Sequence, residues 1–395
     1  MASSSATSAE RQRPELADIV RISGAQFAHA YPLSTEQKRV LDSIVNCRTA
    51  ALGGHQDFCP SCGHSHPAYN SCLNRHCPKC QALAQQRWID AREKRVLPTK
   101  HFHVVFTLPS ELRALAAFAK KPLFDALFEA ASSTLLELAR THLGAELGIT
   151  AVLHTWTRDL RFHPHLHCIV TAGGLSLQND QWISCNQKFL FPVMVLGSLF
   201  RAKMAKILNT LYACGTFDRF DGFADPQAFD RLMQKLAKIN WLVYVKKPFS
   251  NSIYVLRYLG RYTHRVAISN SRIVSVSRQS VTFRTKDGKS ITISPCEFLR
   301  RFVMHILPSR FVKIRHYGLL ASANVHTKLE TARVAIVGRS HPPVSSDTPP
   351  TPLDWSTLLS ILTGRDPRRC PRCGNPLVSL PLPRISPKPS IFDSS

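Results

Sequence analysis

The sequence predicts an α+β fold in which a central antiparallel sheet is flanked by helices and preceded by a small cysteine-rich zinc-binding domain. Two observations predict this class. Strand-like and helix-like segments follow one another in the order strand, helices, strand, strand, which is typical of α+β domains rather than of regular βαβ repeats. Five of the twelve cysteines fall between residues 59 and 80, which indicates a separate module stabilised by metal.

Length and charge limit the classes of protein to which the chain can belong. The chain has 395 residues, enough for two or three domains, and 44% of its residues are apolar and can form packed cores. Its 51 lysines and arginines outnumber 26 acidic residues, so the formal net charge is +25. An excess of this size indicates a polyanionic partner, most often nucleic acid. No long uncharged apolar run and no signal-peptide core occurs, so we expect a cytoplasmic protein without a membrane partner.

The first 98 residues are predicted to form two units. Residues 1–50 have the pattern of a helical segment that is interrupted near Pro32 and preceded by a small polar start that we expect to be disordered. Residues 51–98 contain the clustered cysteines and a basic helix that ends before Pro98. We therefore assign residues 51–98 to a zinc-binding domain that contacts DNA.

Residues 99–325 are predicted to form the main α+β domain. β-branched and aromatic residues indicate a strand over 101–109, and Pro122 restarts a helix that reaches about His142. Two neighbouring strands follow, over 149–157 and 163–174. The remaining predicted elements are helices within 192–238, a strand over 239–249, a helix over 251–265, a hairpin over 280–294, a helix over 295–308 and a strand over 311–318.

Residues 326–395 are predicted to be a tail in which proline and serine dominate from about Arg339 onward. The tail contains one C-x-x-C knuckle, formed by Cys370 and Cys373. Because no partner knuckle is visible nearby, the sequence leaves zinc binding by this pair open.

The strongest local motif is a pair of C-x-x-C knuckles, Cys59 with Cys62 and Cys77 with Cys80. Their separation is typical of two knuckles that supply four thiolates to one tetrahedral zinc ion. We therefore predict that these four residues bind a structural Zn²⁺ ion.

Other residues of the same window are alternatives or neighbours of that site. Cys72 and His76 lie between the knuckles and are alternative ligands. Arg75 and Lys79 flank the second knuckle just before the basic helix. Because such cations suit phosphate groups, we predict that both contact DNA.

Three histidines alternate in the stretch "RFHPHLHCIVTAGG", at His163, His165 and His167. Alternate side chains of a strand share one face, so this row can hold a metal ion. Two imidazoles alone need a further ligand, and Asp159 is the nearest preceding carboxylate, which makes it our expected third ligand. His154, His163 and a group from a distant helix are the alternatives.

A second His-x-His pair, His101 and His103, serves as an internal comparison. Both pairs fall on predicted strands, so the pattern alone does not rank them. His101 and His103 lead into an apolar strand, whereas the other pair follows a charged stretch. We therefore interpret the first pair as part of a core strand that neighbours the site.

Three tyrosines, Tyr254, Tyr258 and Tyr262, are spaced four residues apart on one predicted helical face. Such a stripe is more often part of a core. Arg257 and Arg261 lie between these tyrosines, and we predict that both arginines contact DNA. A tyrosine hydroxyl beside a metal-bound phosphate can act as a nucleophile, so the stripe is also a candidate catalytic element.

The order of these motifs resembles a known family. The strand "HPHLH", the downstream "YLGRY" and the preceding "AYNSCLNRHCPKCQ" are similar to the two-tyrosine HUH transposases of the insertion-sequence-91 family. The segments "HTW", "YTHRVAISN" and "IRHYG" lie between and after them in the family's order. The resemblance extends from about Gly54 to Ser322, which is most of the chain.

The resemblance implies an HUH endonuclease core and a DNA transposase that cleaves and rejoins single-stranded DNA by a rolling-circle-like mechanism. It matches His165 and His167 to the pair that holds a catalytic Mg²⁺ or Mn²⁺ ion, and Tyr258 and Tyr262 to two nucleophiles that form 5′-phosphotyrosine links. Tyr254 lies outside the matched pair. The implied partners are single-stranded element ends and target DNA, without a nucleotide cofactor, in the bacterial cytoplasm at the nucleoid or a plasmid.

Two other functions fit parts of the pattern. A plasmid replication initiator or relaxase shares the histidine pair and the tyrosine. A non-catalytic zinc-finger regulator would need only the charge and the cysteines. A zinc hydrolase built on the row of three histidines lacks the further acidic and histidine ligands that such sites need.

Overall fold

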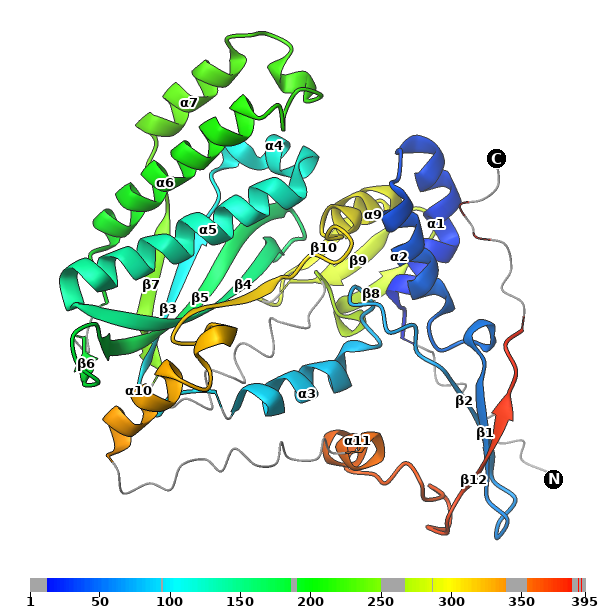
Figure 1. Ribbon diagram of the computed structural model, residues 1–395. Helices are drawn as coiled ribbons and strands as arrows, with labels where there is room; N and C mark the ends of the chain where they lie inside the picture. Colours follow the sequence, from blue (N-terminus) through cyan, green and yellow to red (C-terminus); the bar gives the residue numbers. More distant parts are fainter. Residues whose placement is uncertain are drawn as a thin grey trace, which may run out of the picture.

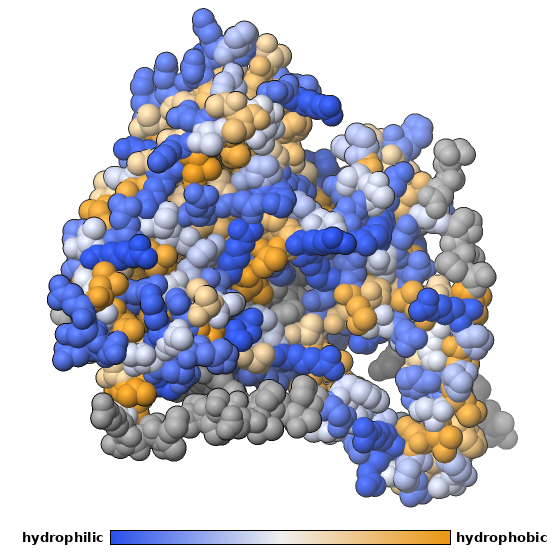
Figure 2. All heavy atoms as spheres, viewed as in Figure 1, coloured by the Kyte–Doolittle hydropathy of each residue, from blue (hydrophilic) through white to orange (hydrophobic). Residues whose placement is uncertain are grey.

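The computed structural model describes residues 13–93, 95–185, 190–249, 267–285, 287–338, 354–385, 390 and 392. Over these residues the chain forms three antiparallel sheets with helices packed on them (Figure 1). The α+β class and the antiparallel sheets predicted from the sequence are confirmed. Figure 2 shows that hydrophilic side chains cover most of one face of the molecule. Among the described residues no helix is long and apolar enough to cross a membrane.

The central sheet has six strands and holds most of the predicted strands. Its order is β11-β4-β5-β3-β7, with β6 paired to β5. β4 and β5 are neighbours, as the sequence predicts, and they form the longest pairing of the sheet. The strands are β3 (His101–Thr107), β4 (Ala145–Trp156), β5 (Phe162–Ser176), β6 (Trp182–Ser184), β7 (Val243–Phe249) and β11 (Ile314–Gly318).

Helices cover one face of the central sheet (Figure 1). Phe102, Val104 and Phe106 alternate along β3 and are fully buried in the main core, where Phe106 packs edge-on against Phe200. Because strand side chains alternate, the odd-numbered residues of β3 and β5 lie on the opposite face. The helices are α4 (Arg113–Phe118), α5 (Lys120–Leu138), α6 (Val193–Ala213) and α7 (Ala228–Lys238).

A second sheet packs against the N-terminal helices. Ser34 caps α2, and Ser294 caps α9 with Pro295 in its first turn. Each serine side chain accepts a hydrogen bond from a backbone N–H of the first turn, which favours the start of the helix at that residue. The predicted hairpin turns at Gly288, whose φ is +83°. The elements of this second lobe are α1 (Leu16–Ala30), α2 (Thr35–Asn46), β8 (Ile273–Val276), β9 (Val281–Arg284), β10 (Ser290–Ile293) and α9 (Pro295–Met304).

A third sheet joins segments from the two ends of the chain. β1 (Gly54–Phe58) pairs with β2 (Ser65–Tyr69) on one edge and with β12 (Val378–Leu382) on the other. The tail is therefore not only a linker, because its described residues include a strand that completes this sheet.

Three further helices are α3 (Gln81–Glu93), α10 (Lys328–Val337) and α11 (Trp355–Thr363). The short helical turns are η1 (Ala50–Leu52), η2 (Ser110–Leu112), η3 (Ala139–Leu143), η4 (Asp221–Phe223), η5 (Asn270–Arg272) and η6 (Ser322–Asn324).

Candidate metal centres

Three histidines meet on the face of the central sheet that points away from α5 and α6. The register of β4 and β5 places His154 directly opposite His165, and His167 follows on the same face. One ring nitrogen from each of the three lies within 4.8 Å of the others. The ring centroids of His154 and His167 are 4.3 Å apart. Three imidazoles at this spacing can hold one divalent cation.

Hydrogen bonds select the ring nitrogens that face this group. Nδ1 of His165 lies 2.7 Å from the carbonyl oxygen of His163, so it carries the proton and donates it. Nδ1 of His167 lies 2.7 Å from Nε2 of His103. In His165 the lone pair then resides on Nε2, which is the arrangement found in metal-ligating histidines, and His167 has the same arrangement when His103 accepts its Nδ1 proton. The histidines therefore fit a divalent cation.

His103 supports the group from the neighbouring strand. It is 1% exposed, and its ring stacks on His167 with centroids 5.0 Å apart. Burial lowers the pKa of His103 to about 4, and nearby Lys246 and His165 act in the same direction. A neutral His103 can accept the Nδ1 proton of His167. The sequence interpretation of β3 as a core strand beside the site is correct, but it missed this contact.

Asp159, the expected third ligand, does not belong to the group. It lies in the turn between β4 and β5, where it accepts a hydrogen bond from Thr157 and pairs with Arg161 at 2.6 Å. Burial raises the pKa of Asp159, but the Thr157 hydroxyl and the Arg161 guanidinium outweigh this effect and hold it below its usual value. His154, one of the stated alternatives, takes the third position because strand pairing brings it there.

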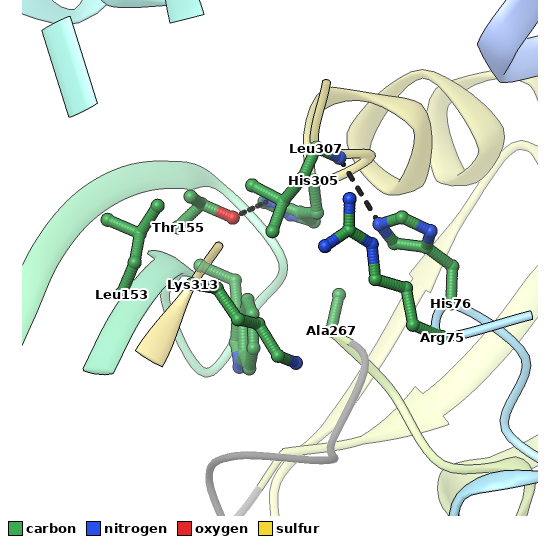
Figure 3. A pocket seen from close by; sticks show the side chains of 9 residues that line it. Arg75, His76, Leu153, Thr155, Ala267, His305, Leu307 and Lys313 are labelled. Carbon is green, nitrogen blue, oxygen red and sulfur yellow. Dashed lines mark hydrogen bonds between the residues drawn. The ribbon is translucent and has the colours of Figure 1, made fainter. Parts of the chain in front are cut away.

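A small pocket is lined by Leu153 and Thr155 of β4 and by His76 and His305 (Figure 3). The ring of Trp156 stacks on His154 with centroids 4.8 Å apart and forms one wall. Behind it, Nε2 of His305 donates to the carbonyl oxygen of Leu160, and Nδ1 accepts from Thr155 at 3.1 Å. Both bonds fix His305 as a neutral ring that supports the wall of the pocket.

The pocket is lined by cations and by no acidic residue among those that the structure describes. Arg75 and Lys313 point into it from opposite sides (Figure 3). Burial lowers the pKa of Lys313 to about 8, with a smaller contribution from Arg75, so Lys313 stays charged at neutral pH. Burial lowers the pKa of His76 to about 3, so this histidine is neutral. The pocket is therefore electropositive.

The predicted nucleophiles Tyr258 and Tyr262, with Arg257 and Arg261, lie outside the described residues. The chain enters this segment from β7 of the central sheet. It leaves it at Ala267, which lines the pocket beside Trp156. The roles of these four residues stay predictions.

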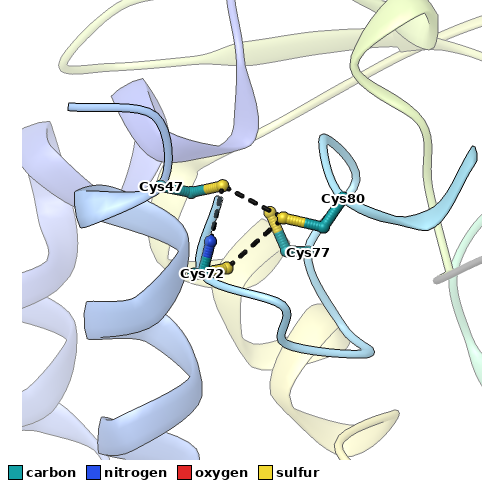
Figure 4. Close-up of side chains that lie close together, drawn as sticks. All are labelled: Cys47, Cys72, Cys77 and Cys80. Atoms are coloured by element: carbon teal, nitrogen blue, oxygen red, sulfur yellow. Dashed lines mark hydrogen bonds between the residues drawn. The ribbon is translucent and has the colours of Figure 1, made fainter. Parts of the chain in front are cut away.

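Four cysteines form a first sulfur group, but they are not the four that the sequence predicts. Cys47, at the end of α2, meets Cys72, Cys77 and Cys80 of the following loop (Figure 4). Sγ of Cys80 lies 3.1 Å from Sγ of Cys47 and 3.6 Å from Sγ of Cys72. Hydrogen bonding with Cys72 contributes most to lowering the pKa of Cys47, which reaches about 7. Thiols at these separations suit a tetrahedral zinc ion.

The two predicted knuckles therefore do not share one ion. Cys59 and Cys62 lie at the end of the β1–β2 hairpin, where they meet Cys370 and Cys373 from the tail. Sγ of Cys59 is 3.5 Å from Sγ of Cys373, and Sγ of Cys62 is 3.6 Å from Sγ of Cys370. The grouping was wrong because spacing along the chain does not record that β12 returns to β1. A signal was present, since C-P-x-C-G occurs at both of these knuckles but not at Cys77 and Cys80.

The predicted DNA contacts near the second knuckle also need correction. The guanidinium of Arg75 donates to the carbonyl oxygens of Phe311 and Pro308, so it ties the zinc loop to the chain that precedes β11. Lys79 forms an ion pair with Glu15. Both side chains are committed to contacts inside the protein, which speaks against the exposed phosphate contacts that the sequence suggested.

Comparison with known proteins extends these observations. Residues 148–328 match a family described as "Putative transposase", and residues 19–108 match one described as "Transposase zinc-binding domain". The first match contains His154, His165 and His167, and the second contains Cys47 and its three partners. Cys370 and Cys373 lie outside both matches.

Two relatives cover most of the chain. "Putative transposase y4qJ" of Sinorhizobium fredii (strain NBRC 101917 / NGR234) is 44% identical over 375 residues, which is 92% of this chain and 94% of the relative. "Transposase for insertion sequence element IS801" of Pseudomonas savastanoi pv. phaseolicola is 29% identical over 348 residues, which is 85% of this chain and 81% of the relative. No solved structure matches.

Proposed function

The chain belongs to the insertion-sequence-91 family of transposases, and from this premise we propose that it cleaves and rejoins single-stranded DNA through 5′-phosphotyrosine intermediates. The observation that carries the proposal is the group formed by His154, His165 and His167 on the sheet face opposite α5 and α6. Their hydrogen bonds prepare Nε2 of His165 and His167 as ligands. Such a group suits chemistry on a phosphate.

We assign the catalytic cation, Mg²⁺ or Mn²⁺, to these three histidines. When bound, the cation polarises the scissile phosphate and stabilises negative charge on its oxygens. His103 keeps His167 in the required tautomer, and Trp156 packs on His154 and limits its rotation. The protein contribution is therefore a rigid ligand set at the junction of β4 and β5.

Tyr258 and Tyr262 are the proposed nucleophiles, by resemblance to the family. The phenolic oxygen attacks phosphorus, the bond from phosphorus to the 3′ oxygen breaks, and that oxygen takes up a proton. The product is a 5′-phosphotyrosine and a free 3′-hydroxyl. Attack of a 3′-hydroxyl on this link reverses the step and rejoins the strand, so no nucleotide cofactor is consumed.

DNA is the partner of a transposase, and two features of the chain favour its binding. The net charge of +25 attracts a polyanion. The cationic pocket of Arg75 and Lys313 lies next to Trp156, beside the histidine group.

A covalent-adduct assay tests the proposal. The purified protein is incubated with Mg²⁺ and labelled single strands that carry the ends of its element, and denaturing gels then report protein linked to DNA. We expect an adduct with the wild type and none with the Tyr258→Phe, Tyr262→Phe double variant. Tyr254→Phe is the matched control, because it changes a tyrosine of the same segment that lies outside the pair. An adduct that persists in the double variant would overturn the assignment.

The same assay tests the ligand set. His154→Ala and His165→Ala should each abolish the adduct while single-strand binding remains. Asp159→Ala should keep the adduct, because Asp159 is bonded to Thr157 and Arg161 instead. The reverse result, loss with Asp159→Ala and retention with His154→Ala, would restore Asp159 as the third ligand.

A further inference from the structure

The second sulfur group is built from two copies of one short sequence. Residues 59–63 read C-P-S-C-G, and residues 370–374 read C-P-R-C-G. Their four Sγ atoms lie within 4.8 Å of one another. The separations of 3.5 and 3.6 Å between facing sulfurs are well above the roughly 2.05 Å of a disulfide bond. The four side chains are therefore facing thiols and not two cystines.

The backbones of the two knuckles are equivalent as well. Cys59 N donates to the carbonyl oxygen of His64 at 2.8 Å, and Gly63 N donates back to Cys59 at 2.9 Å. In the second copy, Cys370 N donates to the carbonyl oxygen of Asn375 at 2.8 Å, and Gly374 N donates to the carbonyl oxygen of Cys370 at 2.9 Å. Both glycines have positive φ, +67° and +77°, which the turn requires. Backbone amides in this tight turn also point toward the thiols, so each knuckle is preformed for a thiolate–metal bond.

The strands pair in the same way in both copies. The residue before the first cysteine pairs with the residue six positions after that cysteine, Phe58 with Ser65 and Arg369 with Pro376. β12 then runs antiparallel to β1, so the two copies face each other across one three-stranded sheet (Figure 1). The arrangement is a four-cysteine ribbon whose halves come from opposite ends of the chain.

This ribbon has almost no hydrophobic core of its own. Within residues 54–69 and 366–384 the buried residues are Cys59 and Cys370. Its larger apolar side chains are exposed, among them Phe58, Val378 and Leu380. Strands this short do not hold together without burial, so something at the cysteines must supply the stability. Metal–thiolate bonds supply it in small domains of this kind.

We propose that Cys59, Cys62, Cys370 and Cys373 bind a second structural zinc ion, which holds the C-terminal segment 366–384 on the β1–β2 hairpin. This site is separate from the one at Cys47, Cys72, Cys77 and Cys80. The ion cross-links residues 308 positions apart along the chain. Without it, β12 leaves β1, and the backbone of β1 becomes an open sheet edge.

Zinc content of the full-length protein tests the proposal. The protein is purified under reducing conditions, and its zinc is measured by mass spectrometry. We expect two ions per wild-type chain and one ion for the double variant Cys370→Ser, Cys373→Ser. The double variant Cys214→Ser, Cys296→Ser is the matched control, since these cysteines lie outside both sulfur groups, and it should keep two ions. Two ions retained in the Cys370 and Cys373 variant would overturn the proposal, as would one ion in the wild type with no loss in the variant.

Hydrogen exchange separates loss of the ion from loss of the fold. In the Cys370→Ser, Cys373→Ser variant we expect the amides of β1 and β12 to lose protection while those of β4 and β5 keep theirs. Unchanged protection of β12 would contradict the proposed role of the ion. If the whole chain lost protection, cobalt added to the wild type would decide the question, because two thiolate sites give twice the visible absorption of one. Neither readout depends on DNA cleavage, so failure of the proposed function leaves this test intact.

Discussion

At the scale of single residues, the orientation of each imidazole decides whether the histidine group can bind a cation. His165 uses its own strand for this purpose, through the carbonyl oxygen of His163. His167 uses a neighbouring strand, through His103. A ring held in this way loses little rotational freedom when the cation binds, which favours binding.

We expect His103→Ala to weaken the binding of Mn²⁺ about 10- to 100-fold, because His167 loses the partner that fixes its tautomer. Titration calorimetry on the variant measures this change without any DNA. His103→Gln should recover part of the affinity, since an amide oxygen can accept the same proton. His101→Gln is the control, because His101 is buried on the same strand but lies outside the group. Equal affinities for the wild type and His103→Ala would contradict the role.

Stability should depend on pH through His305. Burial lowers its pKa in the folded protein from 6.5 to about 4, against a smaller opposing effect of its bond to Leu160. Between these values the unfolded chain binds a proton that the folded chain excludes. The free energy of unfolding is therefore unaffected by His305 above pH 6.5. As the pH falls from 6.5 toward 4, protonation of His305 in the unfolded chain lowers the free energy of unfolding by about 3 kcal/mol.

Urea unfolding at several pH values checks this prediction. In His305→Gln the slope of unfolding free energy against pH should flatten in that window. The exposed His142→Gln is the control and should keep the wild-type slope. A steep slope that survives in His305→Gln would assign the effect to other groups.

At the scale of elements, the pairing of β4 with its neighbouring strands determines which side chains meet in the histidine group. Its register with β5 places His154 opposite His165. Its other edge carries β11, whose last residue, Gly318, lies opposite Gly148. A Cβ atom at Gly318 would lie 1.9 Å from the carbonyl oxygen of Leu147, so the close approach of these strands requires glycine.

Gly318 and Gly144 allow this contact to be measured. Both have φ of +59°, but a Cβ atom at Gly144 would have no neighbour within 4 Å. Gly144→Ala should cost about 1 kcal/mol of stability from backbone strain alone. Gly318→Ala should cost a further 1–3 kcal/mol or so, because strand β11 must shift. Thermal unfolding of both variants gives the difference, and equal losses would show that β11 adapts without cost.

At the scale of the whole molecule, charge and chain connectivity are the features that bear on DNA binding. The chain carries a net charge of +25, and strand pairing joins β12 to β1 across most of its length. The cationic pocket, by contrast, lies between the zinc loop, β4 and the segment before β11. Arg75 of the zinc loop lines this pocket and donates to the carbonyl oxygens of Pro308 and Phe311, so it fixes the loop to the segment before β11.

Binding of single strands should weaken steeply with salt, because cations on the protein release counterions from the phosphates. We expect a loss of at least about tenfold between about 50 and about 200 mM salt, the value for roughly three phosphate contacts. Fluorescence anisotropy measures this slope. A strand with an uncharged methylphosphonate backbone is the control and should show little salt dependence. A similar salt dependence for the DNA strand and the methylphosphonate strand would show that phosphate contacts do not cause it.

The sequence by itself determined the features that depend on neighbouring residues. The His-x-His pairs on strands, the hairpin at Gly288 and the C-x-x-C knuckles all follow from local periodicity, turn chemistry and spacing. Total charge indicated the class of partner, since it needs no fold. The order of the motifs was enough to indicate the family.

Only the tertiary structure decided which of these local features meet. His154 replaces Asp159 because strand register, and not distance along the chain, sets which side chains face each other. Cys59 and Cys62 meet Cys370 and Cys373 because β12 returns to β1 across almost the whole length of the chain. His103 reaches His167 from another strand. Such contacts leave no periodic trace in the sequence, because the free energy that selects them comes from packing and ligand geometry in the folded molecule.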